Sequence, residues 1–147
     1  MSYDLHIRLL DPAQQAPGRN LALGMGRPIR VDGLQKLANH WLKTFLTPKG
    51  SNPRNLLEGT NFTYLLADNA QDPDSAQTAL LEYIEDATEQ VKRAQRLRRT
   101  VPASEILRAA SLLQFTQVSP TTFDIWVTVT NAEGGRLPVL IPYLRLI

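Results

Sequence analysis

The hydrophobic period of this sequence changes near Pro102, and that change constrains the fold more than any other feature. In two segments before Pro102, residues 34–45 and 80–94, apolar residues recur at steps of three and four positions, as on the buried face of an amphipathic helix. After it, residues 123–130 alternate between two faces, which is typical of a half-buried strand. The sequence therefore predicts a single α+β domain over residues 1–147. We expect two main helices packed on a C-terminal antiparallel sheet, with residues 1–30 forming an N-terminal strand and arm.

The first helix is predicted to begin at Asp32, whose side chain can cap the first turn. Its buried stripe consists of Leu34, Leu37, Trp41, Leu42 and Phe45. Thr47-Pro48 ends the helix, because the residue before a proline avoids the helical region. A polar loop over residues 49–54 follows, and Glu58-Gly59-Thr60 leads into a second apolar segment that ends at Leu66.

The second helix is predicted to start with Asp72 as its cap and Pro73 in the first helical position. Its buried stripe is predicted to contain Leu80, Leu81, Ile84, Ala87, Val91 and Ala94. Acidic residues dominate its beginning and basic residues its end, which suits the helix dipole at both termini.

The last strand is predicted over residues 137–147, after strands at 112–118 and 123–130. Apolar residues occupy both of its faces, with Leu137, Val139, Ile141 and Tyr143 on one and Leu140, Leu144 and Leu146 on the other. Pro138 and Pro142 cannot donate a ladder hydrogen bond, so the strand is expected at an edge. The residues alone favour an edge strand covered by the chain's own helices over one covered by a partner.

Composition excludes several classes of protein. The chain has 147 residues, 43% of them hydrophobic, which is enough for one ordinary domain with a core. Its net charge of +2 is too small to argue for nucleic acid by bulk charge. It has no cysteine, and no apolar run approaches the ~20 residues of a membrane span. We expect a soluble, unprocessed protein with no cofactor, no metal and no membrane contact.

Several features follow one another along the chain in a characteristic order. They are the Gly33-Leu34…Leu37 helix entry, the Phe45-Leu46-Thr47…Gly50 helix exit, Gly59 ahead of an apolar turn, the long second helix and the C-terminal strands. From about Gly26 to its end, the chain thereby resembles the baseplate wedge proteins of contractile phage tails. This is the gene-W-like or sheath-initiator family, which is related to a baseplate component of bacterial type VI secretion.

The resemblance implies a structural virion protein, assembled in the host cytoplasm and located in the tail baseplate. Its partners would be baseplate wedge proteins and the tail sheath protein, with tail tube or hub proteins as further candidates. In that family the strand-rich end offers a sheet to which sheath subunits add strands. The candidate contact residues are Lys92, Arg93, Arg96, Arg99, Glu105, Arg108, Leu137, Val139, Ile141, Tyr143, Leu144 and Leu146.

Family members often carry a contiguous Glu-Pro-Arg between the long helix and the sheet, and this motif is implicated in docking to the wedge core. Residues 100–108 read TVPASEILR here, so a proline, an acid and an arginine are present but scattered. We carry the docking role over only to Glu105 and Arg108. The departure puts the docking mode in doubt more than the family.

The run at residues 92–99, KRAQRLRR, is the strongest feature for an alternative function, a nucleic-acid-binding module. It lacks the interleaved aromatic residues of a single-strand binder. A solvated helix end is the commonest outcome for such a run, and a contact with an acidic protein partner is the second. We therefore place nucleic acid third.

Enzymatic readings have little support in the sequence. Neither His6 nor His40 has a Ser or Asp partner at motif spacing, and Pro28 and Ile29 break a dinucleotide loop that would begin at Gly24. Since members of the resembling family are sometimes labelled lysozyme-like, Glu58 is the best candidate acid of a peptidoglycan hydrolase. Its partner carboxylate would be one of Asp68, Asp72 and Asp124, and the spacing selects none. We expect no enzyme activity.

Overall fold

A computed structural model describes residues 31–65, 73–119 and 122–144. The predicted N-terminal strand, the predicted cap Asp72 and the chain end beyond Leu144 lie outside these residues. Within them the elements are α1 (Gly33–Leu46), η2 (Phe62–Tyr64), α3 (Pro73–Arg96), η3 (Ala103–Glu105), β1 (Leu107–Ser119), β2 (Thr122–Asn131) and β3 (Arg136–Leu144). The predicted α+β class is confirmed, with helices packed against a three-stranded antiparallel sheet.

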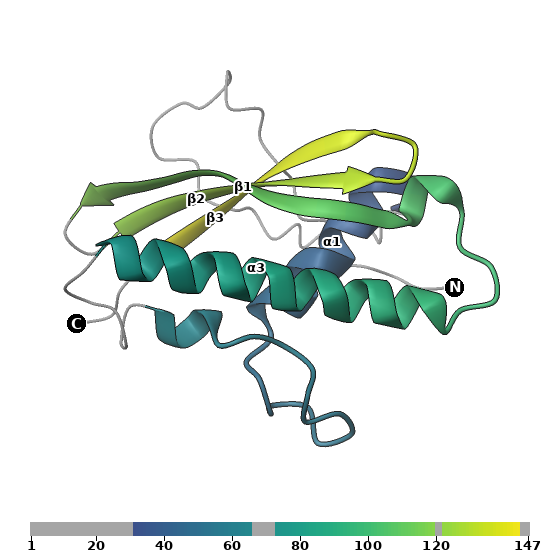
Figure 1. Cartoon of the computed structure of the whole chain (residues 1–147), viewed down its shortest axis with the longest axis horizontal. Helices are drawn as coiled ribbons and strands as arrows, with labels where there is room; N and C mark the ends of the chain where they lie inside the picture. Colours follow the sequence, from purple (N-terminus) through teal and green to yellow (C-terminus); the bar gives the residue numbers. More distant parts are fainter. Residues whose placement is uncertain (1–30, 66–72, 120–121, 145–147) are drawn as a thin grey trace.

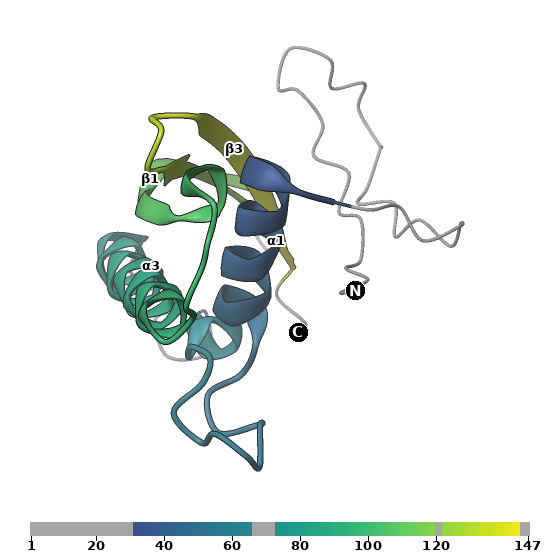
Figure 2. The same ribbon diagram turned by 90° about the vertical axis from the view of Figure 1, so that its right-hand side faces the viewer.

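The described residues form two layers, with α1 and α3 on the same side of the sheet (Figures 1 and 2). Helix α3 packs on β1, while α1 packs on β2 and β3 and also against α3. The core between the layers contains Trp41 and Phe45 of α1, Leu80 and Ile84 of α3, and the β2 residues Ile125, Val127 and Val129. The change of hydrophobic period in the sequence therefore marks the boundary between the two layers.

Helix α1 ends at Leu46, as the Thr47-Pro48 signal predicts, and its stripe is buried except for the partly buried Leu34. The prediction for its start is wrong in one respect. Asp32 is the N-cap residue, but its side chain makes no capping hydrogen bond. The backbone amide of Gly33 instead donates to Oε1 of Glu105, which lies 72 positions later in the sequence, at 3.4 Å.

Helix α3 buries Leu80, Ile84, Ala87 and Val91, as predicted, but Leu81 is 48% exposed. The inclusion of Leu81 was wrong, since residues 80 and 81 differ by about 100° around a helix and only one of them can face the core centre. No described helix is both long enough and apolar enough to cross a membrane.

The sheet has the order β1-β2-β3, so the last strand is an edge strand, as its prolines predicted. Strands β2 and β3 pair without a register shift, from Thr130 opposite Arg136 to Thr122 opposite Leu144. Pairing between β1 and β2 is interrupted between Leu107 and Ala109, between Leu112 and Gln114, and between Gln117 and Ser119. The two edges of this sheet therefore differ in regularity.

Candidate functional site

The junction between α3 and the sheet is fixed by one glutamine. Nε2 of Gln95 donates to the carbonyl oxygen of Glu105 at 2.7 Å, and Oε1 of Gln95 accepts from the amide of Leu107 at 2.9 Å. These bonds connect the last turn of α3 to the entry of β1. Residues 96–106, which include the predicted docking residue Glu105, are thereby held beside the end of the helix.

Glu105 faces the protein rather than a partner. Its carboxylate forms an ion pair with Nζ of Lys36 at 2.8 Å, its side chain is only 14% exposed, and it also accepts the Gly33 amide. The structure thus gives Glu105 a role in joining the start of α1 to the junction. Reversing its charge would disturb α1, so Glu105 cannot serve as a clean test of docking. Arg108, its predicted companion, is exposed on β1.

The basic run surrounds the end of α3 and is not uniform. Lys92 lies 3.3 Å from Oε1 of Glu89, whereas Arg93, Arg96 and Arg99 are exposed. Leu97, at the tip of this turn, is 84% exposed. The run therefore combines cationic groups with one large apolar side chain, a composition that suits a protein contact better than a uniformly solvated face.

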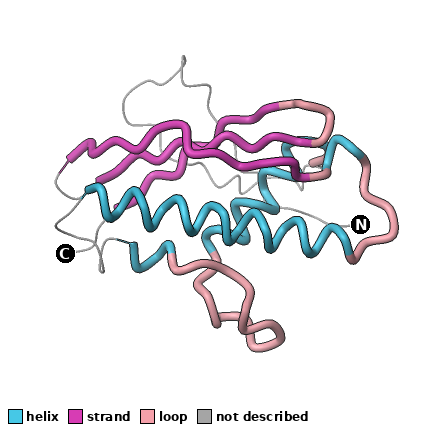
Figure 3. The backbone as a smooth tube through the Cα atoms, viewed as in Figure 1, coloured by secondary structure: helices cyan, strands magenta, loops and turns pink. Residues whose placement is uncertain are grey.

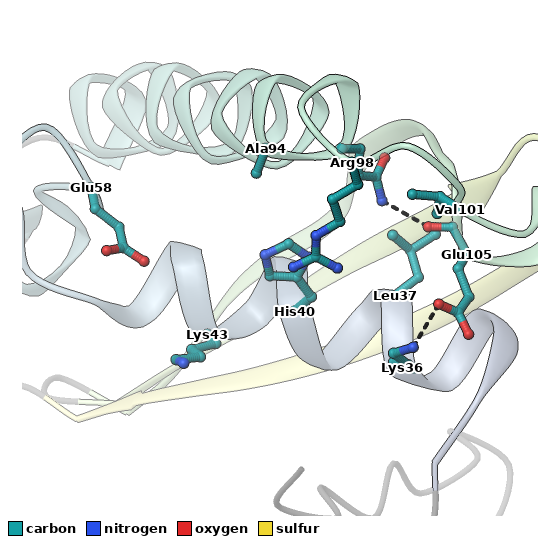
Figure 4. Close-up of a pocket in the computed structure, with 10 residues that line it drawn as sticks. Lys36, Leu37, His40, Lys43, Glu58, Ala94, Arg98, Val101 and Glu105 are labelled. Atoms are coloured by element: carbon teal, nitrogen blue, oxygen red, sulfur yellow. Dashed lines mark hydrogen bonds and ion pairs between the residues drawn. The ribbon is translucent and has the colours of Figure 1, made fainter. Parts of the chain in front are cut away.

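Two grooves lie beside residues 97–99, which follow α3, and Arg98 lines both. The first, which we name the α1–α3 groove, has a volume of about 490 Å³ (Figure 4). It is lined by Lys36, Leu37, His40, Lys43, Glu58, Ala94, Gln95, Arg98, Val101 and Glu105. The second, about 470 Å³, opens beside β1 and includes Lys92, Arg96, Arg99 and Ile106. The sequence predicts the basic run as a candidate contact, but it does not predict that α1 supplies one wall of a groove.

The strand predicted to contact the sheath has one face in the core. Val139 and Ile141 are 0% and 3% exposed and belong to the core cluster beneath α1, so their side chains are not available to a partner. Leu137 is partly buried against the same cluster. The side chains of Tyr143 and Leu144, and all of Leu146, lie outside the described residues. Among the strands that the structure describes, β3 pairs with β2 alone, so its other backbone edge is open there.

Of the residues proposed for a hydrolase, only Glu58 and Asp124 are described, and they do not line one groove. The Glu58 carboxylate is partly buried and accepts a hydrogen bond from Nδ2 of Asn52, which orders the loop. Asp124 lies on β2 and is not among the residues that line the groove beside Glu58. The other predicted partners, Asp68 and Asp72, lie outside the described residues.

The loop between α1 and η2 projects from the two layers and is held at its base (Figure 3). Gln90 of α3 accepts from the Gly59 amide and donates to the Gly59 carbonyl oxygen, both at 2.9 Å. Lys49 pairs with Asp86 at 3.5 Å. Leu56 and Leu57 nevertheless remain 64% and 69% exposed. This fixed loop with apolar tips is a second candidate contact surface, which sequence analysis had treated only as a polar connection.

Among the described residues, no group of three or more His, Cys, Asp or Glu side chains is placed to hold a metal ion. The described residues offer grooves, an exposed loop and a sheet edge. No protein-family model matches this chain, and no curated protein matches it either.

Proposed function

We propose that this chain is a structural, non-enzymatic component of a contractile phage tail baseplate, where it joins wedge proteins to the first layer of the tail sheath. The sequence resemblance over most of the chain motivates the proposal. The observation that carries it is the edge of β3: within the described residues, 31–65, 73–119 and 122–144, this strand pairs with β2 alone, and its other edge is open. An open edge presents backbone donors and acceptors that a strand from another protein can use.

The two prolines determine what this edge can offer. Pro138 and Pro142 lie within an unbroken pairing with β2, and their nitrogens carry no hydrogen to donate. No hydrogen bond between β3 and β2 is lost if both nitrogens face away from β2. Residues two apart direct their backbone groups to the same side, so the amides of Arg136, Leu140 and Leu144 face the open edge as well. A partner strand would find one donor at every fourth residue, with carbonyl acceptors in between.

The other edge is less suited to strand addition. The register shifts of β1 at Leu113 and near both of its ends disturb the regular spacing of outward donors and acceptors. Such bulges are one of the means by which proteins protect sheet edges. Edge prolines limit strand addition as well, but β3 keeps a continuous register over its whole length, and we assign the sheath contact to its edge.

Substitution of Leu140 tests this assignment, because its amide is the central donor of the open edge. Leu140→Pro removes the donor, and the preceding Val139 already has the extended conformation that a following proline requires. Leu140→Ala removes the same side chain but keeps the amide. We expect baseplates with Leu140→Ala to start sheaths, and baseplates with Leu140→Pro to contain the protein but start few or none. Electron microscopy of tails assembled with each variant is the measurement.

Urea unfolding of both variants provides the control for folding. Equal sheath formation by two folded variants would contradict strand addition at β3. Absence of the wild-type chain from purified baseplates would contradict the whole proposal.

Two other functions make different predictions. The exposed arginines at the end of α3 are the observation that favours a nucleic-acid-binding module, which should give a mobility shift that weakens steeply with salt. A peptidoglycan hydrolase should degrade cell-wall substrate and lose this activity in the variant Glu58→Gln. We place the hydrolase below the structural role because, among the described residues that line the groove, the other carboxylate besides Glu58 is Glu105, which is paired with Lys36.

A further inference from the structure

We propose that the α1–α3 groove binds the carboxylate side chain of an acidic peptide segment, and that Lys43 and Arg98 hold it. This inference concerns the groove alone and does not depend on the baseplate proposal. It is motivated by the charge that remains in the groove once the internal ion pairs are counted.

Helix α1 supplies one wall of the groove with a polar strip. Lys36, His40 and Lys43 recur at four- and three-residue steps, which place them on one side of the helix. The opposite wall comes from the last turn of α3 and the residues after it. In Figure 4 the Arg98 side chain reaches from that wall toward α1, and its guanidinium overlies His40 in this view.

The charges of the groove are unequally satisfied. Lys36 is neutralised by Glu105 at 2.8 Å, and Figure 4 places this pair at one end. Lys43 and Arg98 form no ion pair within the described part of the chain, although both line the same space. The groove thus retains two cationic groups from opposite walls. A carboxylate beside Arg98 would make charge-assisted hydrogen bonds, with the guanidinium able to engage both of its oxygens, and Lys43 adds a second positive charge farther along α1.

Apolar residues complete the fit to an acidic side chain. Leu37, Ala94 and Val101 line the groove between its charged groups, and they can contact the methylene groups of a bound Glu. A volume of about 490 Å³ is comparable to that of small-ligand sites and has room for a few peptide side chains.

The groove's own carboxylates favour a peptide over a nucleic acid. Glu105 lies at one end and Glu58 at the other, so a continuous phosphate backbone running through the groove would pass a carboxylate at each end. Like charges brought together in this way cost binding energy. A peptide with a single acid flanked by neutral residues avoids both repulsions.

The test uses the full-length chain and a capped synthetic peptide with one Glu between small neutral residues, with binding followed by NMR titration at low ionic strength. Lys43→Ala combined with Arg98→Ala should weaken binding by about tenfold or more, since the charge-assisted contact of Arg98 and the attraction of Lys43 are both lost. Arg54→Ala combined with Arg93→Ala is the matched control, because both residues are exposed, lie outside the groove and remove the same charge. The control should change the affinity by less than about threefold.

A second variant tests the proposal by removing a negative charge from the groove. Glu58→Gln removes a repulsive charge from the groove and should strengthen peptide binding severalfold. Equal weakening by the two double variants would show attraction to net charge only and would overturn the proposal. So would a single-stranded oligonucleotide that binds more tightly than the peptide and loses its affinity in the Lys43 and Arg98 variant. Lys43 and Arg98 are both exposed, so their replacement should leave the urea midpoint nearly unchanged.

Discussion

Replacing Gly59 by alanine is expected to destabilise the protein by more than about 4 kcal/mol, a loss that few single substitutions produce. Gly59 has φ +95°, a conformation that L side chains rarely adopt. A Cβ atom at this position would lie 2.2 Å from the carbonyl oxygen of Thr47. That oxygen accepts the Thr60 amide at 2.9 Å, so the backbone cannot move away without breaking the closure of the loop.

The matched control is Gly134→Ala, because Gly134 also has a positive φ, +86°, but an added Cβ would meet nothing within 4 Å. This variant should lose only about 1–2 kcal/mol, the cost of the left-handed backbone conformation. Urea unfolding of both proteins gives the two free energies directly. Similar losses for Gly59→Ala and Gly134→Ala would mean that the base of the loop does not close on Thr47 as described.

The second large effect is expected at Trp41, at the centre of the core. Its side chain is 0% exposed, its ring stacks on Phe45 with centroids 5.0 Å apart, and its Nε1 donates to Oγ1 of Thr88 at 3.1 Å. Trp41→Ala should reduce the free energy of unfolding by about 3–5 kcal/mol, because both the buried surface and the packing around the cavity are lost. It would also remove the Trp41–Thr88 hydrogen bond between α1 and α3.

Leu97→Ala serves as the comparison for Trp41→Ala. Leu97 is 84% exposed, and its truncation should change stability by no more than about 0.5 kcal/mol. A loss below about 1 kcal/mol for Trp41→Ala in the same urea melts would contradict the packing of α1 on the sheet.

The elements of this fold could be predicted from local patterns. The stripe from Leu34 to Phe45, the Thr47-Pro48 stop and the alternation over residues 123–130 each depend on neighbours in the sequence. The wrong prediction for Leu81 shows that such patterns do not decide which of two neighbouring apolar residues is buried. Apolar side chains sit on both sides of a helical stripe, and only the packing of α3 on β1 and α1 determines which one is covered.

The candidate sites depend on contacts between distant residues, which periodicity does not record. Glu105 was predicted as an external docking residue, yet it pairs with Lys36 from an element 69 positions earlier. Val139 and Ile141 were assigned to a partner, yet the chain's own helices bury them. The α1–α3 groove likewise combines residues of α1 with residues at and beyond the end of α3, which are far apart in the sequence. The proline argument for an edge strand succeeded because the missing N–H is a property of the residue itself.

Residue-resolved hydrogen exchange along β3 tests the central proposal, strand addition at its open edge, most directly. In the isolated protein, the outward amides of Arg136, Leu140 and Leu144 should exchange much faster than the amides of Val139 and Ile141, which face β2. When sheath subunits are added to baseplates that contain the chain, the outward amides should become protected while the inward ones stay unchanged. Outward amides that are already as protected as the inward ones in the isolated protein, or that remain unprotected when the sheath forms, would contradict the proposal.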